Sequence, residues 1–243
     1  MIVDVNLALG GRDYAGREVT LESLLAVLAD YRIDQGVCYH THALLDPRDG
    51  NAKMAELAER SGGKLSVCAV LDPILGADNL PGEGTLQERL AAFRPACLRI
   101  FPDEARLPFH PIYWEEILEA ANALGLPLIV DCDYDNNFYT NLPWTVLQYP
   151  NVKFILIRQG CCHSRRIVPL LQKRENIYFT TEKMLDHLQL EELDVRCGSR
   201  QLLFGSGYPQ LPHAGALGLV LYAKLWEDHR ENILYKNWEG MTK

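Results

Sequence analysis

The sequence of 243 residues lacks three features that would place it in a special class of protein. It has no apolar run near the roughly 20 residues that a membrane-spanning helix needs, so we expect no membrane segment. It has no basic run longer than a pair, and its formal net charge is −8, so we expect no nucleic-acid partner. The starting stretch MIVDVNLALG has no charged n-region or cleavage site, so we expect no secretory signal.

Cysteine is present, but not in the pattern of a disulfide framework. There are seven cysteines, an odd number, in a chain long enough to build a sizeable core without covalent bridges. Cys38, Cys68, Cys97 and Cys132 each lie in or at the end of an apolar run, which is typical of buried free thiols. We therefore expect a protein of the reducing cytoplasm.

The dominant pattern is an alternation of short apolar runs with amphipathic stretches. In residues 20–31, leucines recur at positions 21, 24, 25 and 28, which is one face of a helix. The expected strands are residues 2–6, 36–40, 64–70, 96–101, 127–133, 152–160, 177–182 and 201–207. The expected helices are residues 20–31, 51–61, 85–93, 112–125, 142–150, 164–175, 186–195 and 216–230.

Eight strand–helix units in one chain predict the fold class. The strand runs are continuously apolar, which indicates a parallel sheet covered by helices on its outer face. We therefore predict a single (β/α)8 TIM barrel that occupies residues 1–243 as one domain. A doubly wound open sheet is the second choice, although the first turn, NLALGGRDYAG, does not match the G-x-G-x-x-G pattern of dinucleotide-binding folds.

In such a barrel the functional site lies at the carboxyl ends of the strands, so the residues found there are the candidates. Several of these positions are polar or charged. They are Asn6, His40, His42, Asp72, Arg99, Asp103, Asp131, Asp133, Arg158, Thr181, Glu182 and Ser206, with Gly207 and Tyr208 after the last strand.

Four segments in this order resemble one known family. MIVDVNLALG, then NVKFILIRQG with ENIYFTTE, then LLFGSGYP, and finally NILYKNWEGM are similar to the amidohydrolase-related (amidohydrolase family 2) TIM-barrel metal-dependent hydrolases, which also include decarboxylases. The resemblance covers most of the chain. It implies a barrel, a site at the strand ends, and a divalent metal held by histidines and an aspartate.

The resemblance places the family's metal ligands on residues of other types. The His-x-His of the first strand falls on Asn6 and Ala8, and the histidines of strands five and six fall on Asp131 and Arg158. The aspartate of strand eight falls on Gly207. Alanine and glycine offer no side-chain ligand, and a guanidinium repels a dication. We therefore expect the usual metal site to be lost and favour no cofactor, as in a pseudoenzyme.

A relocated metal site is the alternative that keeps an active hydrolase or decarboxylase. His40 and His42 are two residues apart on a strand, so their side chains face the same way and could bind a zinc-like divalent metal. Asp131, Asp133 or His163 would complete this metal site. Asp131 and Asp133 are also candidate catalytic acid–base groups. The competing interpretation is that both histidines form hydrogen bonds to neighbouring loops.

Two arginines indicate the ligand. Arg99 and Arg158 each interrupt or end an apolar strand, and a buried arginine needs an anionic partner, for which Asp131 is suitably placed. The same guanidinium groups could clamp a carboxylate or phosphate. We therefore predict a small-molecule, anionic ligand at the barrel mouth. The candidate ligand-binding residues are Asn6, Arg99, Arg158, Glu182 and Tyr208. The sequence leaves open whether the protein is a homo-oligomer.

Overall fold

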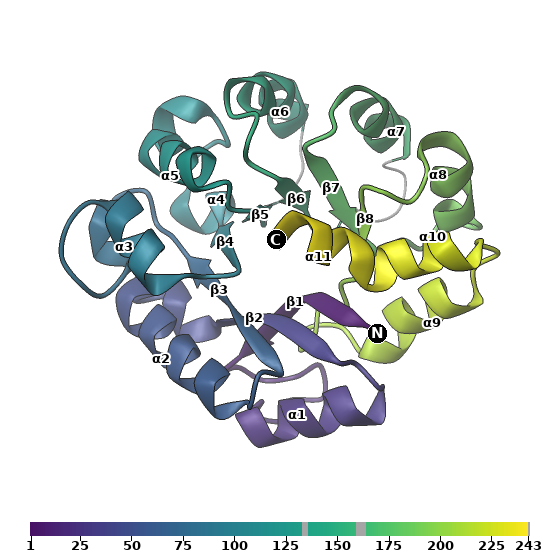
Figure 1. Ribbon diagram of the computed structural model, residues 1–243, viewed down its shortest axis with the longest axis horizontal. Coiled ribbons are helices and arrows are strands. Elements are labelled where there is room, and N and C mark those ends of the chain that lie inside the picture. The colour runs from purple at the N-terminus through teal and green to yellow at the C-terminus, as the bar shows by residue number, and fades with distance from the viewer. Residues whose placement is uncertain (133–135, 159–163, 243) are drawn as a thin grey trace.

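The computed structural model describes residues 1–132, 136–158 and 164–242, and its core is one eight-stranded parallel sheet. The strands neighbour one another in sequence order, each pairing in parallel with the next (Figure 1). They are β1 (Val3–Leu9), β2 (Gln35–His40), β3 (Leu65–Val70), β4 (Cys97–Ile100), β5 (Leu128–Val130), β6 (Phe154–Leu156), β7 (Ile177–Thr180) and β8 (Leu202–Leu203).

The last strand meets the first through backbone hydrogen bonds, so the sheet curls into a barrel. The Val5 N–H donates to the Phe204 carbonyl at 3.0 Å, and the Ala8 N–H donates to the Tyr208 carbonyl at 3.0 Å. An open doubly wound sheet would leave these edges apart. The predicted (β/α)8 TIM barrel is therefore confirmed, and the open sheet is wrong.

Helices follow the strands and form the outer ring (Figure 1). The main ones are α1 (Leu21–Asp30), α2 (Pro47–Arg60), α3 (Leu86–Phe93), α5 (Pro111–Leu124), α6 (Asn136–Gln148), α7 (Ser164–Lys173), α8 (Gln189–Cys197) and α9 (His213–Tyr222). Shorter ones are α4 (Pro102–Ala105), α10 (Glu227–Glu231) and α11 (Asn237–Thr242), with single-turn segments η1 (Thr41–Leu44), η2 (Gly76–Asn79) and η3 (Asn232–Lys236). None of the helices described could cross a membrane.

The expected helix over residues 216–230 is in fact two helices, α9 and α10. The chain is extended at Ala223, where α9 ends. Arg230 of α10 folds back and donates to the carbonyl oxygens of Val220 and Ala223, at 3.3 and 3.1 Å. These carbonyls have no acceptor role left inside the helix, so the arginine satisfies them. Such a contact between two neighbouring helices is not visible in the periodicity of the sequence.

The core has two layers, one inside the barrel and one between the sheet and the helices. Cys68 and Cys97 lie in the inner layer, whereas Cys38 and Cys132 pack in the outer one. All four are buried and free, as predicted. The inner layer also includes Trp238 of α11, so the end of the chain contributes to the barrel interior.

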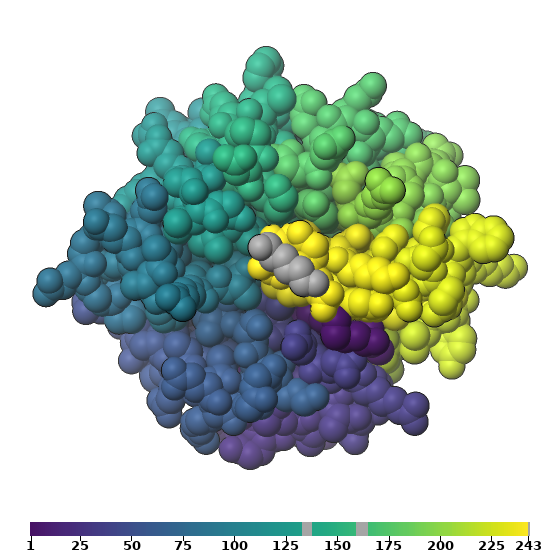
Figure 2. Space-filling model, in the orientation of Figure 1, coloured from purple at the N-terminus to yellow at the C-terminus, as the bar shows by residue number. Residues whose placement is uncertain are grey.

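The C-terminal segment closes one end of the barrel. In Figure 1 α11 crosses the centre of the barrel, and Figure 2 shows the same segment covering this face. Asn237 fixes it by donating to the carbonyls of Ser199 and Leu202, at 2.7 and 2.8 Å, where β8 begins. Because this is the amino end of the strands, the carboxyl end is left for a binding site.

We predict that Gly50→Ala destabilises the protein by about 1–3 kcal/mol. A Cβ at this position in α2 would lie 2.3 Å from the backbone nitrogen of Ala43 in η1, so the two segments would have to separate. Urea denaturation measures the effect. Gly215→Ala in α9 is the control, since its Cβ would meet nothing within 4 Å. A Gly50→Ala protein as stable as the control variant would contradict this packing.

Candidate binding site at the barrel mouth

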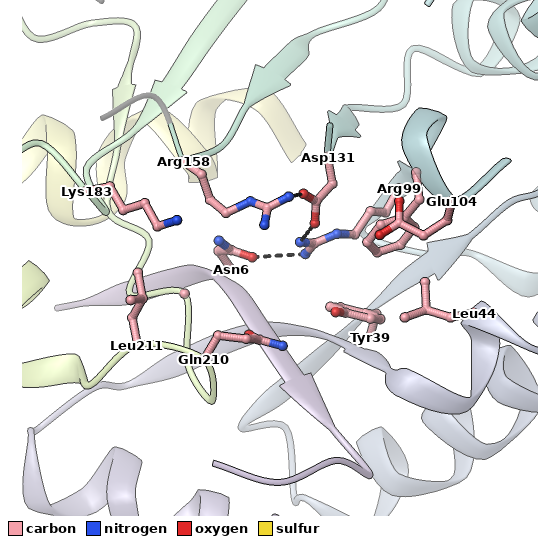
Figure 3. A pocket seen from close by; sticks show the side chains of 12 residues that line it. Asn6, Tyr39, Leu44, Arg99, Glu104, Asp131, Arg158, Lys183, Gln210 and Leu211 are labelled. Atoms are coloured by element: carbon pink, nitrogen blue, oxygen red, sulfur yellow. Dashed lines mark hydrogen bonds and ion pairs between the residues drawn. The ribbon is translucent and has the colours of Figure 1, made fainter. Parts of the chain in front are cut away.

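A pocket of about 360 Å³ opens at the carboxyl ends of the strands (Figure 3). Its residues come from nearly every side of the barrel. The lining consists of Asn6, Tyr39, Leu44, Arg99, Phe101, Glu104, Asp131, Arg158, Lys183, Gly207, Gln210 and Leu211. Its size is at the lower end of the range for small-molecule sites.

Asn6 reaches the pocket because β1 contains a bulge. Asp4 pairs with Gly36 and Leu7 pairs with Cys38, so two residues of β1 face one residue of β2 in between. A bulge of this kind re-aims a side chain. The Asp4 carboxylate stabilises it by accepting the N–H groups of Asn6 and Ser206, at 3.1 and 3.0 Å.

Asp131 lies directly after β5 and binds two arginines. Its Oδ2 accepts from Arg99 and its Oδ1 accepts from Arg158. The Arg99 side chain is only 4% exposed and stacks over the Tyr39 ring, with its guanidinium carbon 4.4 Å from the ring centroid. It also donates to Asn6 Oδ1 at 2.9 Å. The predicted ion pair of Arg158 with Asp131 is therefore present, and Arg99 shares it.

Arg158 is held at its backbone as well as at its side chain. It follows β6 and has a φ of 57°, in the left-handed region that costs a residue with a Cβ about 1–2 kcal/mol. Its N–H donates to Glu182 Oε1 at 2.7 Å, which stabilises this conformation. The side chain is 41% exposed, so part of the guanidinium faces the pocket. Partial burial and the charge of Arg99 lower the pKa of Arg158.

Glu182 lies behind the pocket lining and is completely buried. Its Oε1 accepts three hydrogen bonds, from Asn6 Nδ2 at 3.0 Å, Thr180 Oγ1 at 2.8 Å and the Arg158 N–H. Burial raises the pKa of Glu182 to about 7, against the opposing effect of these hydrogen bonds. We expected Glu182 to bind the ligand directly; the structure places it one layer below, where it supports Asn6 and Arg158.

His40 and His42 are engaged away from the pocket. His40 Nδ1 accepts the N–H of His42 at 3.1 Å, and His42 Nε2 lies 3.1 Å from Asp49 Oδ2 in α2. Burial lowers the pKa of His40. Neither histidine lines the pocket with Asp131. Asp133 and His163, which were also expected in a relocated metal site, both lie outside the described residues.

Tyr208 is the other expected ligand-binding residue that does not line the pocket. Its ring packs against His213 of α9, with the centroids 4.6 Å apart. Several lining residues were not predicted from the sequence, among them Tyr39, Lys183 and Gln210. Lys183 follows directly after Glu182 at a strand end, and this position is the signal that could have identified it.

Solved structures resemble this chain over its whole length, although no protein-family profile and no curated protein sequence matches it. A protein described as an amidohydrolase II has a TM-score of 0.76 at 17% identity, covering 100% of this chain and 99% of that one. The 5-carboxyvanillate decarboxylase of Sphingomonas paucimobilis has a TM-score of 0.74 at 14% identity, covering 99% and 98%. A dihydroxybenzoic acid decarboxylase of Polaromonas sp., with bound manganese, has a TM-score of 0.73 at 14% identity, covering 100% and 97%.

These likenesses confirm the resemblance seen in the sequence at the level of the fold. The positions that the resemblance assigned to metal ligands do converge, since Asn6, Asp131, Arg158 and Gly207 all line one pocket. Their chemistry does not suit a dication, because the only carboxylate among them binds two guanidinium groups. Across residues 1–132, 136–158 and 164–242, no group of three His, Cys, Asp or Glu side chains could hold a metal.

The backbone at Gly207 also differs from what an aspartate would need. Its φ is 72°, in the left-handed region where glycine is favoured. A Cβ there would lie 3.2 Å from Leu211 Cδ1. The turn after β8 is therefore built around glycine, so restoring an acid by a single substitution would strain it.

We predict that Asp131→Asn lowers the free energy of unfolding by about 3–5 kcal/mol, because Arg99 would be left buried without its counter-charge. Urea denaturation measures this loss. Glu192→Gln is the control, since the exposed Glu192–Arg196 pair at 2.9 Å contributes less than about 1 kcal/mol. Equal losses in both variants would show that the buried cluster does not stabilise the fold.

We predict that Glu182 makes stability fall as the pH rises from about 4.5 to 7. Its pKa is about 7 in the fold against an ordinary value of 4.5, so the unfolded chain ionises first. The loss totals about 3 kcal/mol and is constant above pH 7. Glu182→Gln cannot ionise, so its stability relative to the parent should rise over this interval, as measured by denaturation at each pH. Glu56→Gln, at an exposed position, is the control, and a flat difference for Glu182→Gln would refute the linkage.

Proposed function

We propose that this protein is an amidohydrolase-related barrel that binds a small carboxylate or phosphate at its mouth without the metal site of that family. The observation that carries the proposal is the Arg158 guanidinium. It is anchored to Asp131 on one side and remains partly exposed on the side of the pocket, near Lys183 (Figure 3). A planar guanidinium beside an ammonium is a suitable receptor for an anion.

The charge of the lining supports an anionic ligand. Among the described residues of the lining, three cations, Arg99, Arg158 and Lys183, face two carboxylates, Asp131 and Glu104, which gives a net charge of about +1. Arg99 uses its side chain on Asp131 and Asn6 and is buried. Of the cations in the described part of the lining, Arg158 and Lys183 therefore remain for a ligand.

The apolar part of the lining supports a ligand with a hydrophobic body. Tyr39, Phe101, Leu44 and Leu211 lie around the charged groups. Small-molecule sites commonly combine such surfaces with a few polar groups that orient the ligand. Two of the similar structures are named as decarboxylases of 5-carboxyvanillate and dihydroxybenzoic acid, both of them carboxylic acids. These names are consistent with a carboxylate as the ligand of this barrel.

Binding is a better-supported function for this pocket than catalysis. Asp131 was a candidate acid–base catalyst, but its two oxygens bind two guanidinium groups, and the adjacent positive charges favour the ionised carboxylate and make it a poor proton acceptor. A divalent metal does not fit the residues described at the mouth, because the Asp131 carboxylate already binds two guanidinium groups. The alternative through His40 and His42 gains no support from their contacts with each other and with Asp49.

We predict that benzoate or inorganic phosphate binds the protein and that Arg158→Gln weakens this binding roughly 10- to 100-fold, since a hydrogen bond to a charged group is lost. Isothermal titration calorimetry at low salt measures the affinity. Arg200→Gln is the matched control, because it removes the same charge from an exposed residue that precedes β8, at the other end of the barrel.

Added salt should also weaken the parent's binding, because the contact is partly exposed. If neither anion binds, or if Arg158→Gln and Arg200→Gln behave alike, the pocket is not the anion site and the proposal is wrong. The Asp131–Arg99 pair remains in Arg158→Gln, so this variant should fold, and circular dichroism checks that it does.

A further inference from the structure

The mouth pocket has two chemically different sides. In Figure 3 Lys183 and Leu211 lie on one side and Leu44 and Glu104 on the other, with the Arg158–Asp131–Arg99 row between them. The first side belongs to the turns after β7 and β8. The second belongs to η1 and α4, which follow β2 and β4. A ligand that fills the pocket therefore contacts a cationic side and an acidic side.

Glu104 is the acidic group of the second side. It is exposed in α4, and among the described residues no hydrogen bond or ion pair to it is found. This sets it apart from Asp131, whose two oxygens both bind arginines. The charge of the Glu104 carboxylate acts on Arg158, yet no hydrogen bond or ion pair joins the two residues. Glu104 is therefore available to a ligand.

A small side pocket extends the acidic side. It has a volume of about 70 Å³ and shares Leu44, Phe101 and Glu104 with the main pocket. Asp72 also lines it, with Oδ1 accepting the Ile74 N–H at 2.8 Å. No described cation lines it. Since a water molecule takes about 30 Å³ of liquid, the side pocket has room for a small group such as an amine.

We infer that the ligand of this site is dipolar: its carboxylate binds Arg158 and Lys183, its apolar body lies against Phe101 and Leu44, and an ammonium group at the far end faces Glu104. The inference rests on the proposed function, because the carboxylate end is the anion site argued above. It adds the chemical class of the ligand, an amino acid in which an apolar spacer separates the two charged groups.

The other ligand classes fit these two sides less well. A doubly charged phosphate would exceed the net charge of about +1 on the lining and would bring negative charge toward Glu104. A carboxylate ligand with no second polar group would place an apolar group beside the Glu104 carboxylate. That group would displace water from Glu104 and offer it no hydrogen bond in return. A dipolar ligand satisfies both sides at once.

The test uses three probes of equal chain length: hexanoate, hexylamine and 6-aminohexanoate. We expect 6-aminohexanoate to bind the intact protein roughly two- to fivefold more tightly than hexanoate, the gain that one partly exposed ion pair supplies. Hexylamine should bind more weakly than either. Calorimetric titration at low salt measures all three, and 4-(aminomethyl)benzoate against benzoate repeats the comparison with a rigid spacer.

Two variants assign the two ends of the ligand. Glu104→Gln should bring 6-aminohexanoate down to the affinity of hexanoate while leaving hexanoate itself unweakened. Lys183→Gln should weaken both acids and leave their ratio unchanged. Glu83→Gln is the control for Glu104→Gln, because Glu83 is an exposed acid outside both pockets.

The outcomes separate this inference from the proposed function. If the plain acids bind through Arg158 but the amino acids show no advantage in either series, the dipolar ligand is wrong and the anion site stands. If the advantage persists in Glu104→Gln, the ammonium is bound elsewhere and the inference is again wrong. If no acid of either series binds, or if their binding does not depend on Arg158, the proposed function itself fails.

Discussion

The site depends on one carboxylate that binds two guanidinium groups. Asp131 holds Arg99 in the barrel interior and Arg158 at its rim. Arg99 is buried against Tyr39 and Phe101, and a charge in that position is tolerated only with a partner. Arg158 is oriented by the same carboxylate, so the residue that stabilises the interior also aims the group that faces the pocket.

Asp131 and Glu182 are two carboxyl groups near the mouth that have different roles because their surroundings differ. Asp131 is surrounded by positive charge, whereas Glu182 is buried with only neutral donors on its Oε1. The first is a permanent anchor, and the second has a pKa of about 7. Both act on Arg158, one through the guanidinium and one through the backbone N–H. The position of this arginine therefore depends on two strands besides its own.

The barrel keeps the geometry of a strand-end site while its side chains differ from those of a metal centre. Asn6, Asp131, Arg158 and Gly207 come together as the resemblance implied. Fold and chemistry are separable in this architecture, because the strands are held by the core and the mouth is made by the residues that follow them. The similarity of the fold to decarboxylases therefore does not establish the function of this protein, which depends on the residues at its own barrel mouth.

The sequence was sufficient to predict the alternation of buried strands and amphipathic helices, and hence the barrel, because hydrophobic periodicity is a local property. It also identified Arg99, Arg158 and Asp131 as partners, since charges inside apolar strands require one another. It could not determine which way side chains point beyond the strand ends. Three features depend on contacts between distant segments, which local sequence patterns do not reveal. They are the bulge that turns Asn6 inward, the packing of Tyr208 against His213 and the position of Lys183 in the pocket lining.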